Sequence, residues 1–147
     1  MNRRRATRHR DDRGQTYLWA MWLCLMLFGF GGLGLDLWRG ISAWRSFAAT
    51  ADAAAAAGAS GIDEAVFRTS GGNTIQLDPA TAETIAYENL ASQADDSEIT
   101  SYTASATTEE ITVIVNGQID FALLGIFADD DAVTLTATAT ADPRPSG

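Results

Sequence analysis

Apolar residues follow different patterns in successive parts of the chain, and each pattern predicts a different element. Residues 16–35 form an uncharged, mostly apolar run. As a helix rising about 1.5 Å per residue, this run spans roughly 30 Å, the thickness of a bilayer hydrocarbon core. Residues 37–55 carry apolar positions at helical spacing, and residues 132–141 alternate apolar residues with threonine. The sequence therefore predicts an α+β fold whose long N-terminal helix spans a membrane with its first half.

The helix is expected to continue beyond the apolar run, with Asp36 marking the exit from lipid. Asp36 and Arg39 stand three residues apart and are expected to pair at the surface, which contributes only about 0.2 to 0.5 kcal/mol. A packing stripe at steps of four and three residues consists of Leu37, Ile41, Trp44, Ala48, Ala51 and Ala55. Because alanine allows a close approach, we expect this stripe to lie against a small sheet or against neighbouring helices.

The rest of the chain predicts a small pilin-like antiparallel sheet with one additional helix. Segments 65–69 and 74–78 flank Ser-Gly-Gly-Asn and predict a hairpin. Asp78 and Pro79 give a helix start signal, and apolar spacing extends that helix to about Gln93.

Three further strands are expected at 99–106, 111–116 and 132–141. The middle one is β-branched almost throughout, which favours a central position in the sheet. The apolar segment 121–127 is expected to form a short helical turn on the sheet or to contact a membrane or partner.

Charge is divided unevenly along the chain. Residues 1–13 contain six arginines and two aspartates, a formal charge of +4, so the net charge of -9 leaves -13 for the remainder. Basic residues beside a membrane span favour a cytoplasmic position, and we prefer this interpretation to nucleic-acid binding. The predicted organisation is a basic cytoplasmic tail (1–13), a transmembrane helix (14–35), its extracytoplasmic continuation (36–60) and a small extracytoplasmic α+β domain (61–147).

A cleaved secretory signal is the rival interpretation of the N-terminus. The apolar run is longer than a usual signal core, and no clear cleavage site directly follows it. The sequence favours a retained anchor in the cell membrane.

Composition argues against an enzyme. The only histidine, His9, lies in the basic tail, and the only cysteine, Cys24, lies in the apolar run, so neither predicts a nucleophilic or zinc site outside. Glycines 29, 31 and 34 match G-x-G-x-x-G, but no strand precedes them, so no dinucleotide site is expected. We expect no cofactor and no metal.

Adjacent carboxylates are weaker candidates for chemistry. Glu109–Glu110 and Asp63–Glu64 would each point to opposite faces of a strand, so neither pair predicts an acid and a base. Asp129, Asp130 and Asp131 lack the spacing of a calcium loop and indicate a solvated turn.

The order of several short segments resembles a known family. "DRGQ" at 12–15, the apolar run, "GLGLDLWR" at 32–39 and "ATADAAAAAGA" at 49–59 are similar to the TadE/TadG-like proteins of the Tad (Flp) pilus assembly system. The positions that match the family are Arg13, Gly14, Asp36, Arg39 and Asp52. The stretch from Leu123 to Pro143 also resembles the family's terminal strand.

This resemblance implies a membrane-anchored accessory protein, or minor pseudopilin, in the assembly or secretion of an adhesive bacterial pilus. Expected partners are the lipid bilayer, the pilin, pseudopilins and the inner-membrane platform. Related pilins are cut after a glycine and carry glutamate five residues later, whereas Gly14 is followed there by Trp19. The departure favours the uncut, TadG-like type.

Two other functions are weighed against this one. The first is a signal-anchored extracytoplasmic binding module, adhesin-like and unrelated to pili. The second, less favoured, is an exported hydrolase that depends on carboxylates.

Overall fold

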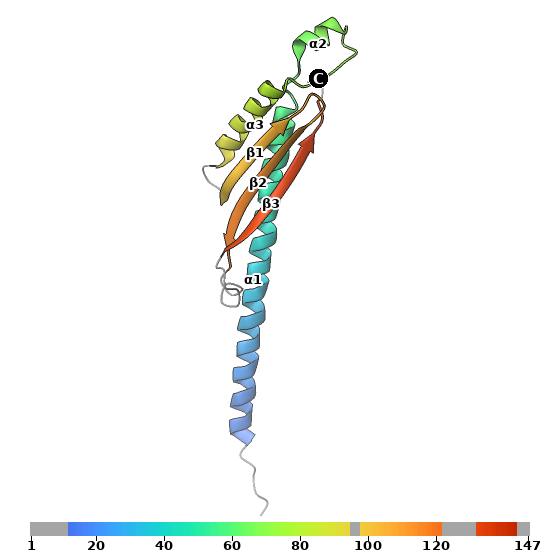
Figure 1. Ribbon diagram of the computed structural model, residues 1–147. Coiled ribbons are helices and arrows are strands. Elements are labelled where there is room, and N and C mark those ends of the chain that lie inside the picture. Colours follow the sequence, from blue (N-terminus) through green and yellow to red (C-terminus); the bar gives the residue numbers. More distant parts are fainter. Residues whose placement is uncertain (1–11, 95–97, 122–131, 144–147) are drawn as a thin grey trace, which may run out of the picture.

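The first element is a long helix that carries the rest of the fold on its second half. The computed structural model describes residues 12–94, 98–121 and 132–143. Helix α1 (Asp12–Gly58) is unbroken over 47 residues, which at 1.5 Å per residue is about 70 Å. The predicted continuation of the helix beyond Asp36 is confirmed. Figure 1 shows α1 as a rod with the sheet against its C-terminal half.

The hairpin predicted for 65–69 and 74–78 is wrong. Helix α2 (Glu64–Thr69) replaces its first strand. The second segment contributes only a single bridge, in which Leu77 pairs with Ile62. The described residues therefore contain a short helix in addition to the two that the sequence predicts.

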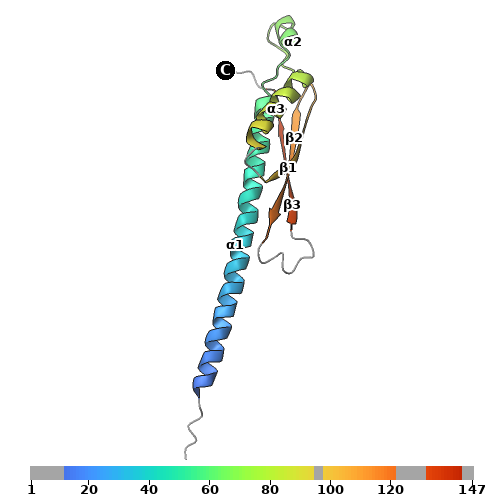
Figure 2. The same cartoon turned by 90° about the vertical axis from the view of Figure 1, so that its left-hand side faces the viewer.

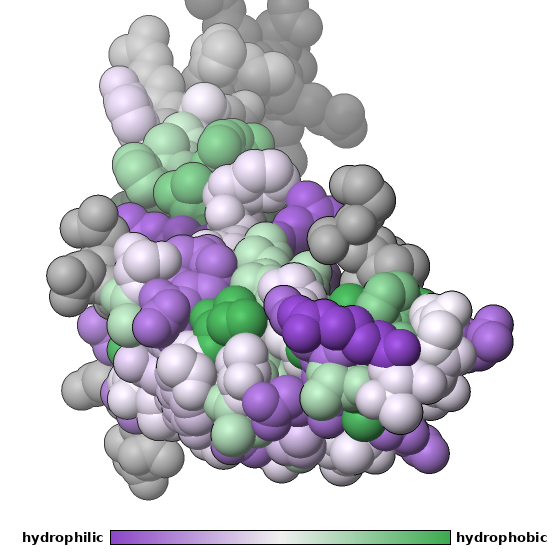
Figure 3. All heavy atoms as spheres, turned by 90° about the horizontal axis from the view of Figure 1, so that it is seen from above, coloured by the Kyte–Doolittle hydropathy of each residue, from purple (hydrophilic) through white to green (hydrophobic). Residues whose placement is uncertain are grey.

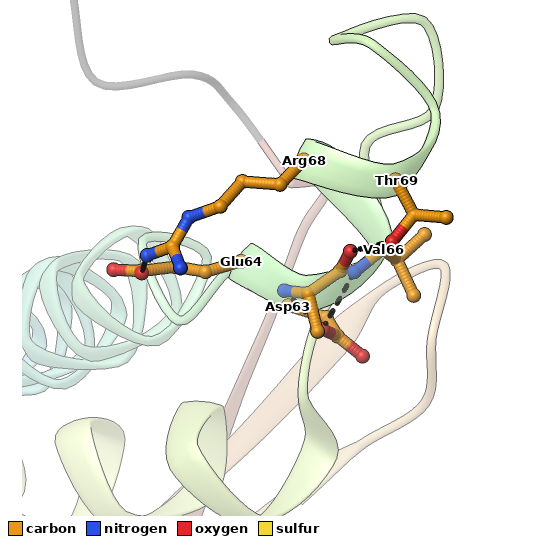
Figure 4. Close-up of polar contacts among 6 residues, drawn as sticks. Asp63, Glu64, Val66, Arg68 and Thr69 are labelled. Carbon is orange, nitrogen blue, oxygen red and sulfur yellow. Dashed lines mark hydrogen bonds and ion pairs between the residues drawn. The ribbon is translucent and has the colours of Figure 1, made fainter.

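A strong local cap explains why α2 is helical. The Asp63 carboxylate accepts hydrogen bonds from the N–H groups of Ala65 (2.9 Å) and Val66 (3.0 Å), which would otherwise have no partner at a helix start. Glu64 and Arg68, one helical turn apart, form an ion pair. Both interactions are drawn in Figure 4. This side-chain chemistry outweighs the strand preference of valine, phenylalanine and threonine.

Helix α3 (Pro79–Ala94) agrees with its prediction at the start and extends one residue past Gln93. Its side facing the rest of the fold carries Ala82, Ala86 and Leu90, all of them 0 % exposed. Small residues let α3 lie close to the end of α1. A Cβ on Gly58, the last residue of α1, would stand 2.9 Å from the Ala82 carbonyl oxygen.

The sheet contains β1 (Ile99–Ala106), β2 (Ile111–Asp120) and β3 (Ala132–Ala141), in the order β1-β2-β3 and antiparallel throughout. The predicted strands are confirmed, and β2 is central as expected. It runs beyond its predicted end at Asn116 as far as Asp120.

The core lies between the sheet and the two longer helices, which cover the same face of the sheet (Figures 1 and 2). Burial alternates strictly along β2, where Ile111, Val113 and Val115 are 0 % exposed. From α1, the residues Phe47, Ala51, Ala54 and Ala55 enter this core. The predicted α+β fold, with a long N-terminal helix and an antiparallel sheet, is confirmed.

Two predicted features lie outside the described residues. The segment 121–127 is described only at Phe121, whose ring is 3.4 Å from the position of a Cβ on Gly40. The aspartates 129–131 belong to the same undescribed stretch.

Candidate functional site

The N-terminal half of α1 is an exposed apolar surface. Within Gly14–Gly58, the most apolar stretch is long enough to cross a membrane, and none of it is buried. The opposite end of the molecule, which carries α2, shows hydrophilic and intermediate residues with scattered apolar ones (Figure 3). A signal sequence satisfies the same criteria of length and composition as a membrane span. The structure thus shows one candidate membrane helix near the N-terminus.

Asp36 lies inside the protein instead of at its surface. Its exposed fraction is 1 %, and it takes part in a polar or electrostatic interaction. Arg39, one turn further along α1, is exposed. Asp36 is therefore enclosed by the protein, and both its place at the exit from lipid and its pairing with Arg39 stay predictions.

The predicted stripe is buried only toward the end of α1. Ala51 and Ala55 are 1 % exposed and Ala48 is half-buried. Leu37, Ile41 and Trp44 are exposed by 61 %, 42 % and 50 %. They are not among the residues that pack in the core, and their contact with a neighbouring helix stays a prediction.

A side chain that the stripe does not include explains the difference. Phe47 is 2 % exposed, and its ring occupies the space where a Cβ on Gly117 of β2 would stand. The missing side chain of Gly117 turns the Phe47 side of α1 toward the sheet, and Trp44 faces outward. An isolated glycine in a strand signals such a close approach, but Gly117 lies just past the strand end that the sequence predicts.

The residues that carry the resemblance to the TadE/TadG-like proteins do not lie together at one site. Arg13 and Gly14 lie in the first turn of α1. Asp52 is exposed beside buried Ala51. Asp36 and Asp52 are sixteen positions apart, about 24 Å along the helix. These residues can orient the helix or contact partners, but they form no catalytic group.

No constellation for catalysis or metal binding appears among the described residues. None of their His, Cys, Asp and Glu side chains gather in groups of three that could hold a metal. Glu109 and Glu110 lie in the β1–β2 turn and not on a strand, and both backbone N–H groups bond to the Thr107 hydroxyl. Cys24 is exposed on the apolar half of α1. Glycines 29, 31 and 34 lie inside the helix, and a Cβ on any of them would meet no described atom within 4 Å.

Two hollows mark the level at which α1 meets the end of the sheet. The larger is a mixed groove of about 700 Å³. It is lined by Trp38, Arg39, Ser42, Ala43, Ser46, Phe47, Glu98, Ile119 and Asp120. The smaller is an apolar hollow of about 210 Å³ between Phe121 and the exposed residues Leu37, Ile41 and Trp44.

The two edges of the sheet differ, which the sequence analysis missed. The Tyr87 hydroxyl bonds both backbone groups of Ala104, donating to its carbonyl (3.3 Å) and accepting from its N–H (3.2 Å). The Glu83 carboxylate accepts from the Ala106 N–H at 2.9 Å. Side chains of α3 thus form hydrogen bonds with backbone groups of β1 that point away from β2. The sequence feature that could have predicted this cap is the spacing of Glu83 and Tyr87, which lie four residues apart on the helix that precedes an edge strand.

Comparisons with protein families, with curated proteins and with solved structures give no match to this chain.

Proposed function

We propose that this chain is a single-pass, non-enzymatic assembly protein of a Tad-type pilus machinery, anchored in the bacterial cell membrane. Its arginine-rich N-terminus lies in the cytoplasm and its α+β domain outside. In this role α1 holds the domain at a fixed height above the lipid, where it contacts the pilin, pseudopilins or the inner-membrane platform.

The observation that supports the proposal is that one helix serves both as the candidate anchor and as part of the domain core. The apolar half of α1 is exposed, whereas Phe47, Ala51 and Ala55 of the same helix are buried under the sheet. No flexible linker separates the two halves, because the helix is unbroken from Asp12 to Gly58. A rigid connection of this kind suits a part of an assembly better than a tethered, freely moving binding module.

The order of charge supports the orientation. Six arginines precede the apolar run, whereas residues 36–147 contain seventeen Asp and Glu residues and four arginines. Arginine and lysine near a span favour the cytoplasmic side.

Protease protection tests the anchor and its orientation. In spheroplasts, external protease is expected to digest the domain and to leave a membrane-embedded N-terminal fragment. A mature chain that is soluble and lacks the first fifty residues would contradict the anchor.

Affinity purification from detergent-solubilised membranes tests the assembly role. Recovery of the pilin or the inner-membrane platform, together with loss of surface pili in a deletion strain, is the expected result. Recovery of a cell-wall or host ligand alone, with normal piliation, would favour an adhesin-like module instead.

A further inference from the structure

The hydrogen-bond pattern of the sheet identifies which backbone groups of β3 face outward. The backbone N–H and C=O groups of Ala104 both bond to Tyr87, so they point away from β2. Because these groups alternate in direction along a strand, those of the neighbouring Thr103 point toward β2. Thr103 pairs with Ile114, so the backbone N–H and C=O groups of Ile114 point toward β1. Those of the next residue, Val115, therefore point toward β3. Val115 pairs with Ala137.

The same alternation continues along β3. Ala137 and its odd-numbered neighbours bond to β2, and the residues between them direct their N–H and C=O groups to the open side. These residues are Thr134, Thr136, Thr138 and Thr140. Their side chains are exposed, and within the described part of the chain no hydrogen bond reaches their outward backbone groups.

Among the described residues, this edge carries none of the features that protect edge strands. Proteins block such edges with charged residues, proline, bulges or a covering element. The edge of β1 has a register shift between Ile99 and Ser101 and is capped by Tyr87 and Glu83. The ten residues of β3 include no charge and no proline, and their register with β2 is uninterrupted. The edge of β1 is therefore capped, whereas no described residue pairs with the outward edge of β3.

The charge of the domain indicates which kind of added strand would pair favourably with the edge of β3. Exposed Asp120 lies opposite Ala132 at one end of the neutral edge, and exposed Asp142 follows its other end. The domain of residues 61–147 contains fifteen acidic residues and only two basic ones, Arg68 and Arg144. A second copy of this chain would bring the same acidic domain against itself, whereas a segment with basic ends would meet opposite charge at both ends of β3.

We propose that the free edge of β3 binds an extended segment of another polypeptide, which adds a strand to the sheet and carries basic residues flanking an uncharged core. The backbone groups of the outward threonines provide the hydrogen bonds, and the acidic ends select the partner and fix its register. The capped edge of β1 limits the sheet to one added strand. This surface is a property of the sheet and does not depend on the assignment to pilus assembly.

The test uses the full chain in detergent micelles and a fluorescent synthetic peptide of alternating threonine and valine with two arginines at each end. Saturable binding by anisotropy is expected, weakening as salt is added. Two control peptides are matched in length: one has glutamates in place of the arginines, and one is N-methylated at every residue of its core so that neither of its edges can donate. Both are expected to bind at least about tenfold more weakly.

Two variants of the protein complete the test. Thr138→Pro removes an outward N–H that β2 does not use, so it is expected to keep the fold, by circular dichroism, and to lose about tenfold in affinity. Thr138→Val keeps the N–H and is expected to bind like the wild type. Equal binding of the N-methylated peptide to the wild-type chain overturns the strand pairing, whether or not Thr138→Pro folds. Equal binding of the glutamate peptide, or a wild-type dimer that competes with the peptide, overturns the basic partner.

Discussion

Close contact between a glycine and an aromatic ring sets how α1 lies on the sheet. A Cβ built on Gly117 of β2 would overlap the Phe47 ring, and the Glu98 carbonyl oxygen lies 2.9 Å from where that Cβ would stand. Phe47 is buried, so its ring is held in the core between α1 and the sheet. The interface therefore depends on the absence of a side chain at this position.

Gly117→Ala is expected to destabilise the domain by about 1 to 3 kcal/mol, because the added methyl overlaps the Phe47 ring. Urea unfolding followed by circular dichroism measures the loss. Combining it with Phe47→Leu should recover part of the lost stability, since the smaller side chain makes room. Additive effects of the two substitutions would show that the clash lies elsewhere.

The cap on the β1 edge makes a second prediction for a single residue. Tyr87→Phe removes the hydroxyl that serves both backbone groups of Ala104, which is 5 % exposed, so a loss of about 1 kcal/mol in the free energy of unfolding is expected. Tyr102→Phe is the matched control, because no hydrogen bond of its hydroxyl is formed within the described residues. A loss of equal size in both variants would contradict the edge cap.

At the scale of elements, periodic patterns predicted more than local ones. The alternation in 132–141 was sufficient to place β3, and apolar spacing gave the length of α3 to within one residue. Helix α2 was missed because its six residues are too few to show a period, and the cap from Asp63 decides its structure. The outward turn of Trp44 depends on Phe47 meeting Gly117, a contact between distant segments that helical spacing alone does not contain.

The alanine face of α1 provides the test at this scale. Ala51→Phe places a large ring where the helix meets the sheet at 1 % exposure, and a loss of about 3 kcal/mol or more in unfolding free energy is expected, the upper end for overpacking. Ala53→Phe, on the exposed side of the same helix, is expected to change stability by less than about 0.5 kcal/mol. If the two variants unfold alike in urea, the alanine face is not the docking surface.

At the scale of the whole molecule, α1 divides into a half that the domain needs and a half that it does not. Every buried apolar residue of α1 lies between Phe47 and its end at Gly58, while the stretch long enough to span a membrane is wholly exposed. The sequence alone predicted this division, because the change from a continuous apolar run to spaced alanines is visible in it. The groove formed with Glu98 and Asp120 was not predictable, since it brings together separate elements.

Two truncations separate these halves. A chain of residues 36–147 keeps the whole core and is expected to fold, with a melting temperature within a few degrees of the full chain in micelles, because no residue of 14–35 enters the core. A chain of residues 59–147 loses Phe47, Ala51, Ala54 and Ala55 and leaves one face of the sheet uncovered. Burial of apolar area is the main source of stability in a domain without a disulfide, so this second chain is expected to be unfolded or aggregated by circular dichroism and gel filtration. A folded 59–147 chain would mean that the sheet and α3 form a domain of their own, and α1 would then act as a tether instead of a part of the core.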